Sequence, residues 1–426
     1  MSMPLQISRR ANARGALVAG LMLWVIGAAR PAWAESTALP SPLHLREAIS
    51  LARAQRAEIA AVRARTAAAH QVPKAVSLPD PMVMVGADHV PLRLHGLDAS
   101  LQVQQDFPLS GALGAKRRAA EADVAVWSAE IGTTTLDVER EAASAFLMVV
   151  ETERMVALTE ELSALAKQAL AIIRARLQGG DGAASDLVRA QIEVLRLEGD
   201  VKALQADLRS ASAMLEAALG QPVTGNNVAC ALSTPTRAVP SLTAVVASAM
   251  ESRPELWAAR ARATREGANV DVMRTMYKPM AFVRGGTAYR MTEGPGVMLM
   301  VGVTVPLWRE RLRAGVDEAS AMQSMAAHDV LAMGRMIEGE AGAAREALAA
   351  AQARWDVARD SLVPLSRRSL SLLLASYAGG QAPLVSVLEG LRTLREARMP
   401  EITAEIRVNL AWLRLGRATG KIEATL

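Results

Sequence analysis

The sequence repeats itself after about 200 residues, and this duplication constrains the fold more than any other feature. Gly179-Gly180 is matched by Gly379-Gly380, and the segment 106–109 is matched by 304–307. The stretch between the copies contains three prolines, one glycine and two asparagines, which is the composition of a loop. A repeat of this length predicts one supersecondary unit built twice. The expected divisions are a first repeat, a linker and a second repeat, at residues 35–220, 221–240 and 241–426.

Each repeat is expected to contain a helix, two short strands and a long helical hairpin, in that order. No proline occurs from Ala112 to Gln178, so this segment can form one helix on the order of 100 Å long at ~1.5 Å per residue. The returning helix, Ala183–Leu219, would add about 55 Å. In the two repeats the first helices are expected over 43–69 and 242–276, the strands over about 82–107 and 281–305, and the hairpins over about 112–219 and 309–419.

The composition favours helices that pack through narrow seams, because 51% of the residues are hydrophobic but only 3% are aromatic. The returning helix of the first repeat carries a heptad pattern, which is typical of coiled coils. Its seam positions are Leu187, Ala190, Val194, Leu197, Val201, Leu204, Leu208, Ala211 and Leu215. The second repeat has the same spacing from Val387 to Leu415, with alanine or glycine at several positions. Such seams indicate structural packing rather than a binding site.

The strand segments are the second unusual feature, because apolar and polar residues alternate within them. In the first repeat, Leu101 and Val103 alternate with Gln102 and Gln104. The segments are eight to ten residues long, which is close to the length of a tilted membrane-spanning strand. Five aromatic residues lie in or beside the strands, where an interfacial girdle would sit: Phe107, Tyr277, Phe282, Tyr289 and Trp308. The alternative is a small soluble sheet that caps the coiled coil.

A membrane location of this sheet would require several copies of the chain. Four strands are too few for a closed barrel, since about eight are the minimum. An open sheet edge that faces lipid would leave backbone groups unpaired. If the sheet lies in a membrane, the protein must therefore be an oligomer whose copies pool their strands.

Residues 1–34 are typical of a secretory signal peptide. They contain four arginines and no acidic residue, an apolar stretch over 15–29, and a small-x-small cleavage motif at Ala32–Ala34. Fifteen apolar residues are too few for a helix that spans a bilayer. The Arg9-Arg10 pair leaves a twin-arginine route open, although the general secretory route is the preferred interpretation. Outside this segment 44 basic residues nearly balance 43 acidic ones, so the charge does not indicate nucleic acid binding.

The sequence offers no motif for catalysis or for a resident metal ion. Cys230 is the only cysteine, which excludes an internal disulfide and any cluster of cysteine ligands. The five histidines do not have the HExxH spacing, and His89 and His95 are expected to be surface residues. We therefore predict that the protein is not an enzyme and uses no cofactor.

Two motifs carry a family resemblance. The segment Arg176–Leu187 fits the pattern basic-apolar-x-x-Gly-x-x-x-x-Ser/Thr-Asp-apolar, and the stretch from Val103 resembles a strand that leads into a long helix, with Lys116 and Arg117 at its start. Together with the duplication, these motifs resemble the outer membrane efflux protein family, the TolC-like channels, over essentially the whole mature chain. The resemblance implies a mainly α fold with a small β part, in which a homotrimer forms a twelve-stranded β-barrel and a periplasmic α-helical tunnel.

The same resemblance implies a location and partners. The barrel would lie in the outer membrane lipid of a Gram-negative bacterium, and the tunnel would extend into the periplasm. A periplasmic adaptor (membrane fusion) protein and an inner-membrane pump of the resistance-nodulation-division type would complete the system. The protein would then be the exit duct of a tripartite exporter.

Candidate sites follow from the resemblance. The hairpin tips, which dock the adaptor in the family, correspond to Gly179, Gly180, Ser185, Asp186, Gly379 and Gly380. Glycine suits such turns because it adopts positive φ readily. The inner constriction corresponds to Ser386 and Glu389, and because the first position is serine, only Glu389 could supply a ring of charge that attracts cations. A plain turn glycine and a solvated glutamate are the structural alternatives.

Two prolines predict that the second hairpin bends. Pro364 lies 16 residues before Gly380 and Pro400 lies 20 residues after it, so both sit roughly 24–30 Å from the tip. Proline inside a helix removes a hydrogen bond and kinks the helix. The first hairpin contains no proline. We therefore expect the second hairpin to form the gate, with Pro364 and Pro400 as hinges.

The cargo and the competing functions are less constrained. The segment Ser77–Gly86 resembles the start of the first strand in members that serve heavy-metal exporters, and the 20 methionines are compatible with soft metal ions. Methionine is also an ordinary filler of packing gaps, which is the preferred interpretation. A periplasmic adaptor and a structural coiled-coil scaffold of the envelope are the alternative functions. Two hairpins count against the adaptor, and the alternating strands count against the scaffold.

Overall fold

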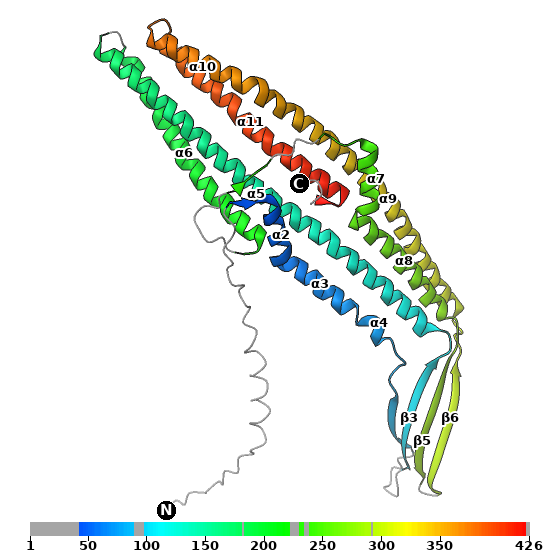
Figure 1. The fold of residues 1–426 in the computed structure, drawn as a ribbon. Helices are drawn as coiled ribbons and strands as arrows, with labels where there is room; N and C mark the ends of the chain where they lie inside the picture. The colour runs from blue at the N-terminus through cyan, green and yellow to red at the C-terminus, as the bar shows by residue number, and fades with distance from the viewer. Residues whose placement is uncertain are drawn as a thin grey trace, which may run out of the picture.

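The computed structural model describes residues 42–88, 98–180, 183–221, 230–233, 238–290 and 293–422. The predicted signal peptide, His89, His95 and most of the linker lie outside the described residues. Figure 1 shows an elongated molecule, in which helical hairpins end in two tips at one end and a small sheet lies at the other. Among the described helices, none combines the length and the apolar character needed to cross a membrane.

The first hairpin is built from two uninterrupted helices. Helix α5 (Ala112–Gln178) has 67 residues, as the absence of proline predicts, and α6 (Ala184–Leu219) returns along it. The seam predicted for α6 is confirmed. Six of its nine positions are buried, and Leu187, Val201 and Leu204 are half-buried.

The second hairpin has an interrupted outgoing helix. Helix α9 (Arg309–Val357) passes through the π-helical turn η1 (Ala358–Leu362) into α10 (Val363–Ala378), and α11 (Leu384–Thr419) returns. The amide of Val363 donates to the carbonyl of Ala358, five residues back, which is the π-helical pattern.

Pro364 is the second residue of α10, which begins right after this turn. It has no N–H to donate to the carbonyl four residues back, so the regular α-helical pattern must be adjusted here. Pro400 lies inside α11.

The expectation of one continuous first helix in each repeat is wrong. In the first repeat the structure has α2 (Leu45–Gln55), α3 (Ala57–Ala69) and a short α4 (Val72–Ala75). In the second repeat it has α7 (Leu242–Ser252) and α8 (Pro254–Thr275). The α2–α3 break and the α7–α8 break are each a single arginine with extended backbone, at ψ 124° for Arg56 and ψ 119° for Arg253. Pro254 disfavours helical backbone at the residue before it, which explains the second break.

No proline follows Arg56, so the first break has another cause, which lies in the contacts of the Arg56 side chain. The Arg56 guanidinium donates to the carbonyl of Ala218 at 3.1 Å, at the C-terminal end of α6, and to the carboxylates of Glu58 and Glu141 at 2.7 and 2.8 Å. A cation at the C-terminal end of a helix binds carbonyls that have no partner within the helix. It also interacts favourably with the negative end of the helix dipole. This set of contacts is called the Arg56 clamp below.

The second repeat contains the same arrangement, which was not predicted. The Arg253 guanidinium donates to Ala418 at 3.3 Å, at the end of α11, and to Glu255 and Glu340 at 2.8 and 2.9 Å. This set is called the Arg253 clamp. The sequence signal was the recurrence of Arg-x-Glu at Arg56 and Arg253, 197 residues apart.

The predicted strands are present and form one antiparallel sheet. The strands β2 (Met82–Asp88), β3 (Asp98–Pro108), β5 (Met280–Arg290) and β6 (Gly294–Thr304) lie in the order β2-β3-β5-β6. Gln104 pairs with Arg284 in the centre, which fixes the register of the two middle strands. A second, unpredicted pair joins β1 (Leu43–His44) to β4 (Cys230–Ala231) in parallel.

The hairpins pack on each other through a shared core. One cluster of buried residues combines Leu170 and Ile173 of α5 and Val194 of α6 with Leu370 of α10 and Leu391 of α11. A Cβ added at Gly390, a predicted seam position, would lie 2.8 Å from the Leu373 side chain. The small seam residues therefore allow the close approach that the sequence indicated.

Candidate functional site

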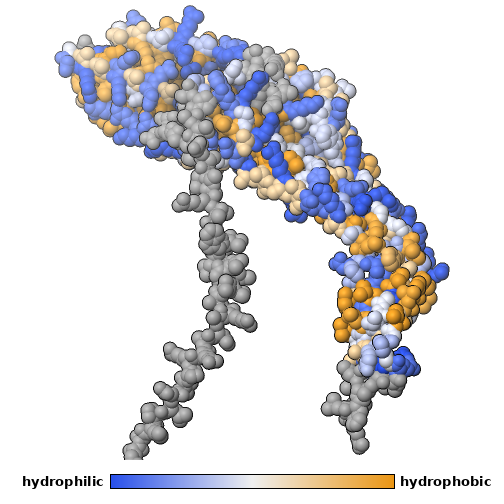
Figure 2. Space-filling model, turned by 60° about the horizontal axis from the view of Figure 1, so that its bottom comes forward, coloured by the Kyte–Doolittle hydropathy of each residue, from blue (hydrophilic) through white to orange (hydrophobic). Residues whose placement is uncertain are grey.

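The sheet presents one strongly apolar face, called the apolar face below. Alternate residues of all four strands point to it, and their side chains are largely exposed: Val83, Val85, Leu101, Val103, Val283, Val297, Leu299, Val301 and Val303. Val85 is 82% exposed and Val297 is 89% exposed. Figure 2 shows hydrophobic side chains gathered over this end of the molecule. A contiguous apolar surface of this kind marks contact with another apolar phase or a partner.

The opposite face, called the polar face, carries a hydrogen-bonded network. The Arg284 guanidinium donates twice to the side-chain oxygen of Gln104, at 3.0 and 2.5 Å. The Gln104 amide donates in turn to Asp106 at 2.9 Å, and Gln102 donates to Ser100 at 3.3 Å. One apolar and one polar face are what a sheet between lipid and water requires.

The aromatic residues expected to form a girdle do not all do so. The Phe282 ring lies on the polar face against Gly302, where an added Cβ would come within 2.2 Å of the ring. Tyr277 and Trp308 are exposed beside the helical end of the sheet, and Tyr289 is exposed towards its other end. Phe282 therefore fills the space over a glycine, while these three positions fit an interfacial role.

The two hairpin tips have matching turns. Gly180 has φ +86° and Gly380 has φ +75°, so the predicted positive φ is confirmed at both. The Gly380 amide donates to the carbonyl of Tyr377 at 3.0 Å, and the Gln381 amide donates to Ser376 at 2.8 Å. These bonds close the C-terminal end of α10.

A contact that the sequence did not reveal joins the tips. The Arg176 guanidinium of α5 donates to the carbonyl of Tyr377 in α10 at 2.9 Å, and its carbon atom Cζ lies 4.9 Å from the centre of the Tyr377 ring. Tyr377 is buried. Burial raises the pKa of the Tyr377 phenol, and the charge of Asp186 adds to this rise, whereas Arg176 opposes it. Of the other two residues predicted for this tip, Asp186 is half-buried and Ser185 is exposed.

The residues predicted for a constriction lie on the first turns of α11. The Ser386 amide donates to the carbonyl of Pro383 at 3.1 Å. Glu389 is 69% exposed, and its carboxylate lies 3.9 Å from Arg392 of the same helix. The negative charge expected at Glu389 is thus accompanied by a nearby cation.

The described residues give no sign of a metal centre made of the usual ligands. No group of three or more His, Cys, Asp or Glu side chains that could hold an ion occurs among them. Burial raises the pKa of the Cys230 thiol to about 12, with a further contribution from the charge of Glu153. This thiol is therefore protonated and unreactive at neutral pH.

Comparison with known proteins places the geometry in a structural class. No protein-family model and no curated protein matches the sequence. The channel-forming protein CusC superposes with a TM-score of 0.77 over 92% of this chain and 96% of its own, at 14% identity. The outer membrane protein VceC from Vibrio cholerae superposes with a TM-score of 0.73 over 89% of this chain and 97% of its own, at 18% identity. The outer-membrane channel OprN superposes with a TM-score of 0.76 over 88% of this chain and 89% of its own, at 16% identity.

The chain has the fold of these three membrane proteins. The expected mainly helical fold with a small β part is thereby confirmed. At these identities the likeness concerns the fold, and it covers both hairpins and the sheet because it extends over about nine-tenths of the chain.

Proposed function

We propose that this protein is an outer-membrane channel, the exit duct of a tripartite efflux system. The observation that carries the proposal is the sheet with an exposed apolar face, joined directly to hairpins on the order of 100 Å long. The sheet would cross the outer membrane, and the helices would reach into the periplasm. The fold shared with CusC and VceC supports this assignment.

The proposal includes a homotrimer. Among the described strands, β2 and β6 each pair on one side only, so both edges of the sheet are open. Three chains would contribute twelve strands, enough to close a barrel and pair every edge. The polar face, with Arg284, Gln104 and Asp106, would then line the pore.

Location and mass test this proposal together. The envelope is fractionated, the native protein is extracted in mild detergent, and the mass of the oligomer is measured. A trimer in the outer membrane is the expected result. A soluble or inner-membrane species without that oligomer would contradict the duct and favour the adaptor or scaffold alternatives.

We propose that the tips dock a periplasmic adaptor, which would connect the duct to an inner-membrane pump of the resistance-nodulation-division type. The tips include Gly179, Gly180, Gly379 and Gly380. Space around Gly180 is open, since an added Cβ would meet nothing within 4 Å. A photo-crosslinking residue placed at Ser185 should capture the adaptor. The same residue at Ser128, an exposed serine near the start of α5 and far from the tip, is the matched control.

We propose that Ser386 and Glu389 face the narrow end of the pore. Three copies of Glu389 would attract cations, and the nearby Arg392 would weaken that attraction. Glu389→Gln should therefore reduce cation selectivity, and Arg392→Gln should increase it. Equal selectivity in both variants and the parent would contradict this role.

For the cargo we propose soft metal ions, on the basis of methionines on the polar face. One row of paired residues crosses the sheet from β2 to β6 and consists of Met82, Gln104, Arg284 and Met300. The neighbouring row on the same face begins at Met84 on β2 and ends at Met298 on β6. Closing a barrel would bring the β6 edge of one chain beside the β2 edge of the next. Thioether sulfur is a ligand for monovalent copper.

The cargo test compares metal tolerance among variants. Replacing Met82, Met84, Met298 and Met300 by leucine should lower copper or silver tolerance of cells that depend on the channel. Tolerance to dyes and detergents should be unchanged. The same substitutions at Met322 and Met325, which lie on α9, are the control. Equal metal tolerance in the two sets would remove the metal assignment.

A further inference from the structure

A pocket of about 810 Å³ lies where the sheet meets the helices. It is lined by the ends of α4 and α8, the starts of α5 and α9, and three residues at the helical end of the sheet, Pro108, Met280 and Thr304. Its volume falls within the range of small-molecule sites, ~300–1,000 Å³. The pocket is therefore large enough for an organic molecule.

The pocket lies on the polar face of the sheet. Pro108 pairs with Met280, and Met280 pairs with Thr304, so these three residues form one row across the sheet. Successive side chains of a strand alternate between the two faces. Met280 lies four residues from Arg284, so this row shares a face with the network of Arg284 and Gln104. In the proposed channel this face lines the pore, and three copies of the pocket would surround the axis.

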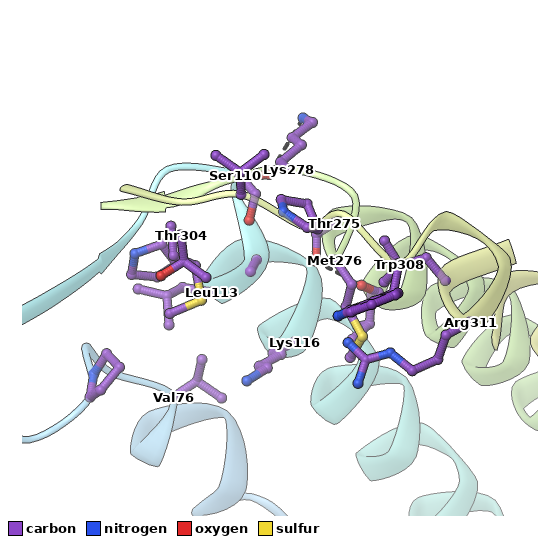
Figure 3. Close-up of a pocket in the computed structure, with 18 of the residues that line it drawn as sticks. Val76, Ser110, Leu113, Lys116, Thr275, Met276, Lys278, Thr304, Trp308 and Arg311 are labelled. Carbon is purple, nitrogen blue, oxygen red and sulfur yellow. Dashed lines mark hydrogen bonds between the residues drawn. The ribbon is translucent and has the colours of Figure 1, made fainter. Parts of the chain in front are cut away.

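The pocket carries positive charge. Lys116, Lys278 and Arg311 line it, and none of the described residues that line it is acidic. Figure 3 shows Lys116 and Arg311 at one end of the pocket and Lys278 at the other. The Lys278 amine lies 3.5 Å from the carbonyl of Ser110. Within the described part of the chain, neither Lys116 nor Arg311 forms an ion pair.

Lys116 and Arg311 lie where the helix dipole disfavours a cation. Lys116 is the fifth residue of α5, and Arg311 is the third residue of α9. The N-terminal end of a helix carries partial positive charge, so it stabilises an anion and destabilises a cation. The first turn of α5 holds no acidic residue, and Glu310 of α9 is not among the residues that line the pocket. An anion bound between Lys116 and Arg311 would relieve this repulsion.

Apolar side chains complete the lining. Leu113 of α5 and Met276, directly after α8, contribute from the helices, and Met280 contributes from β5. Trp308 also lines the pocket and is 75% exposed, which places it at the rim. An apolar lining with a few polar groups at one end is typical of sites for organic molecules.

We propose that this pocket binds amphipathic organic anions as they pass through the duct. A carboxylate or sulfonate group would accept charge-assisted hydrogen bonds from Lys116 and Arg311, and the apolar body of the molecule would contact Leu113 and Met276. The inference rests on the proposed function, because it needs the polar face to line the pore. It adds a second class of solute to the metal ions, whose methionine rows lie farther along the same face.

Block of the channel by two related probes tests the proposal. The oligomer of the full chain is reconstituted in planar bilayers. The probe 5-dimethylaminonaphthalene-1-sulfonate is an anion, whereas the sulfonamide with the same ring is neutral. The sulfonate should reduce the current at a concentration about tenfold lower than the sulfonamide, because only the sulfonate offers an ionised acceptor to the two cations.

Two charge variants locate the site. The variant K116Q/R311Q should lose the difference between the probes. The variant R274Q/R313Q removes the same charge from the end of α8 and the start of α9. Both of its arginines lie outside the pocket lining and within 4 Å of acidic side chains, so it should keep the difference.

A second measurement leaves both cations in place. The sulfonate bound in the pocket should accept excitation energy from Trp308, and this transfer should fall in W308F. Equal block by the two probes in the parent, equal loss of the difference in both charge variants, or energy transfer that is unchanged in W308F would overturn the proposal.

The failure of this inference is distinguishable from failure of the proposed function. The envelope fraction that yields the oligomer and the conductance of the oligomer are recorded first. A conducting oligomer from the outer membrane that does not discriminate between the probes would leave the duct standing and exclude the anion site. Recovery from any other fraction would exclude the duct itself.

Discussion

Arg176 of one hairpin donates a hydrogen bond to the backbone carbonyl of Tyr377 in the other, 2.9 Å away. The same carbonyl accepts the amide of Gly380, which closes the end of α10. One side chain of the first repeat thus completes the tip of the second. The two tips of a chain are held together by this contact rather than by apolar packing alone.

Arg176→Ala should therefore separate the tips. It removes a charged hydrogen bond and a ring contact, which together stabilise the pairing by about 1–3 kcal/mol. Spin labels on the two tips should report longer distances, and single-channel recordings should report higher conductance. Arg174→Ala, an exposed arginine of the same helix, should change neither. Identical distances in the two variants would contradict the role of Arg176.

Pro364→Ala/Pro400→Ala should stiffen the second hairpin. Alanine restores the missing backbone N–H at each position. At 364 this removes the cause of the π-helical turn 358–362, so α10 can join α9 as a regular helix, and at 400 it removes the proline from the interior of α11. We expect altered opening in conductance and export assays. Pro383→Ala, at the start of α11 and outside both helices, is the control. Unchanged conductance together with unchanged export would exclude a hinge.

Gly420→Ala should destabilise the protein more than Gly180→Ala does. Both glycines have positive φ, which costs alanine on the order of 1 kcal/mol or more. At Gly420 an added Cβ would also lie 2.7 Å from the carbonyl of Ser252, beside the Arg253 clamp, whereas the space at Gly180 is open. Thermal unfolding of the two variants measures the difference. Equal melting temperatures would show that the close approach at Gly420 relaxes freely.

Gly302→Ala should disturb the sheet, because its Cβ would meet the Phe282 ring at 2.2 Å. We expect a lower yield of the folded oligomer. Gly296→Ala in the same strand has 3.8 Å of clearance from the carbonyl of Ala288 and should be tolerated. Replacing the ring by a smaller side chain, in the double variant Phe282→Leu/Gly302→Ala, should restore part of the yield of folded oligomer. If it does not, the clash is not the cause.

The Arg253 clamp should make stability depend on acid pH. Burial works against ionisation of Glu255, but the bond from Arg253, its own backbone amide and the charge of Arg417 outweigh burial and hold its pKa below the ordinary 4.5. The ionised form is therefore favoured by folding. Its contribution is fully present above pH 4.5 and is lost as the pH falls through the lowered pKa.

Unfolding of the parent and of Glu255→Gln should be compared from pH 7 to pH 3. The difference in the free energy of unfolding should shrink as the pH falls below 4.5. Glu58→Gln, the counterpart in the Arg56 clamp, should give a smaller effect, because the Glu58 side chain is 53% exposed and that of Glu255 is 14% exposed. A constant difference across this range would contradict the assignment.

Local signals predicted much of the fold. The proline-free run predicted α5 residue for residue, and alternation predicted the four strands, because both patterns are properties of the segment itself. The break at Arg56 was missed since no proline marks it. Its cause lies in carbonyls at the end of α6, some 160 residues away.

The candidate site was predicted less fully, because part of it also depends on contacts between segments that are far apart in the sequence. Positive φ at Gly180 and Gly380 follows from the turn and was predicted. The contact between Arg176 and Tyr377 depends on how two separate hairpins lie side by side, and periodicity within either one carries no information about that. Phe282 was assigned to a girdle because its place in a strand was clear, whereas its position over Gly302 depends on the pairing of β5 with β6.

The duplicated hairpins are mechanically unequal. One is a rod of two unbroken helices, while the other carries a π-helical turn between its outgoing helices and Pro400 inside its returning helix, at similar heights. In the proposed threefold assembly, rigid and compliant walls would alternate around the axis. The mouth of the tunnel could then widen through every second wall, while the rigid ones preserve its length and keep the docking ends at a constant depth.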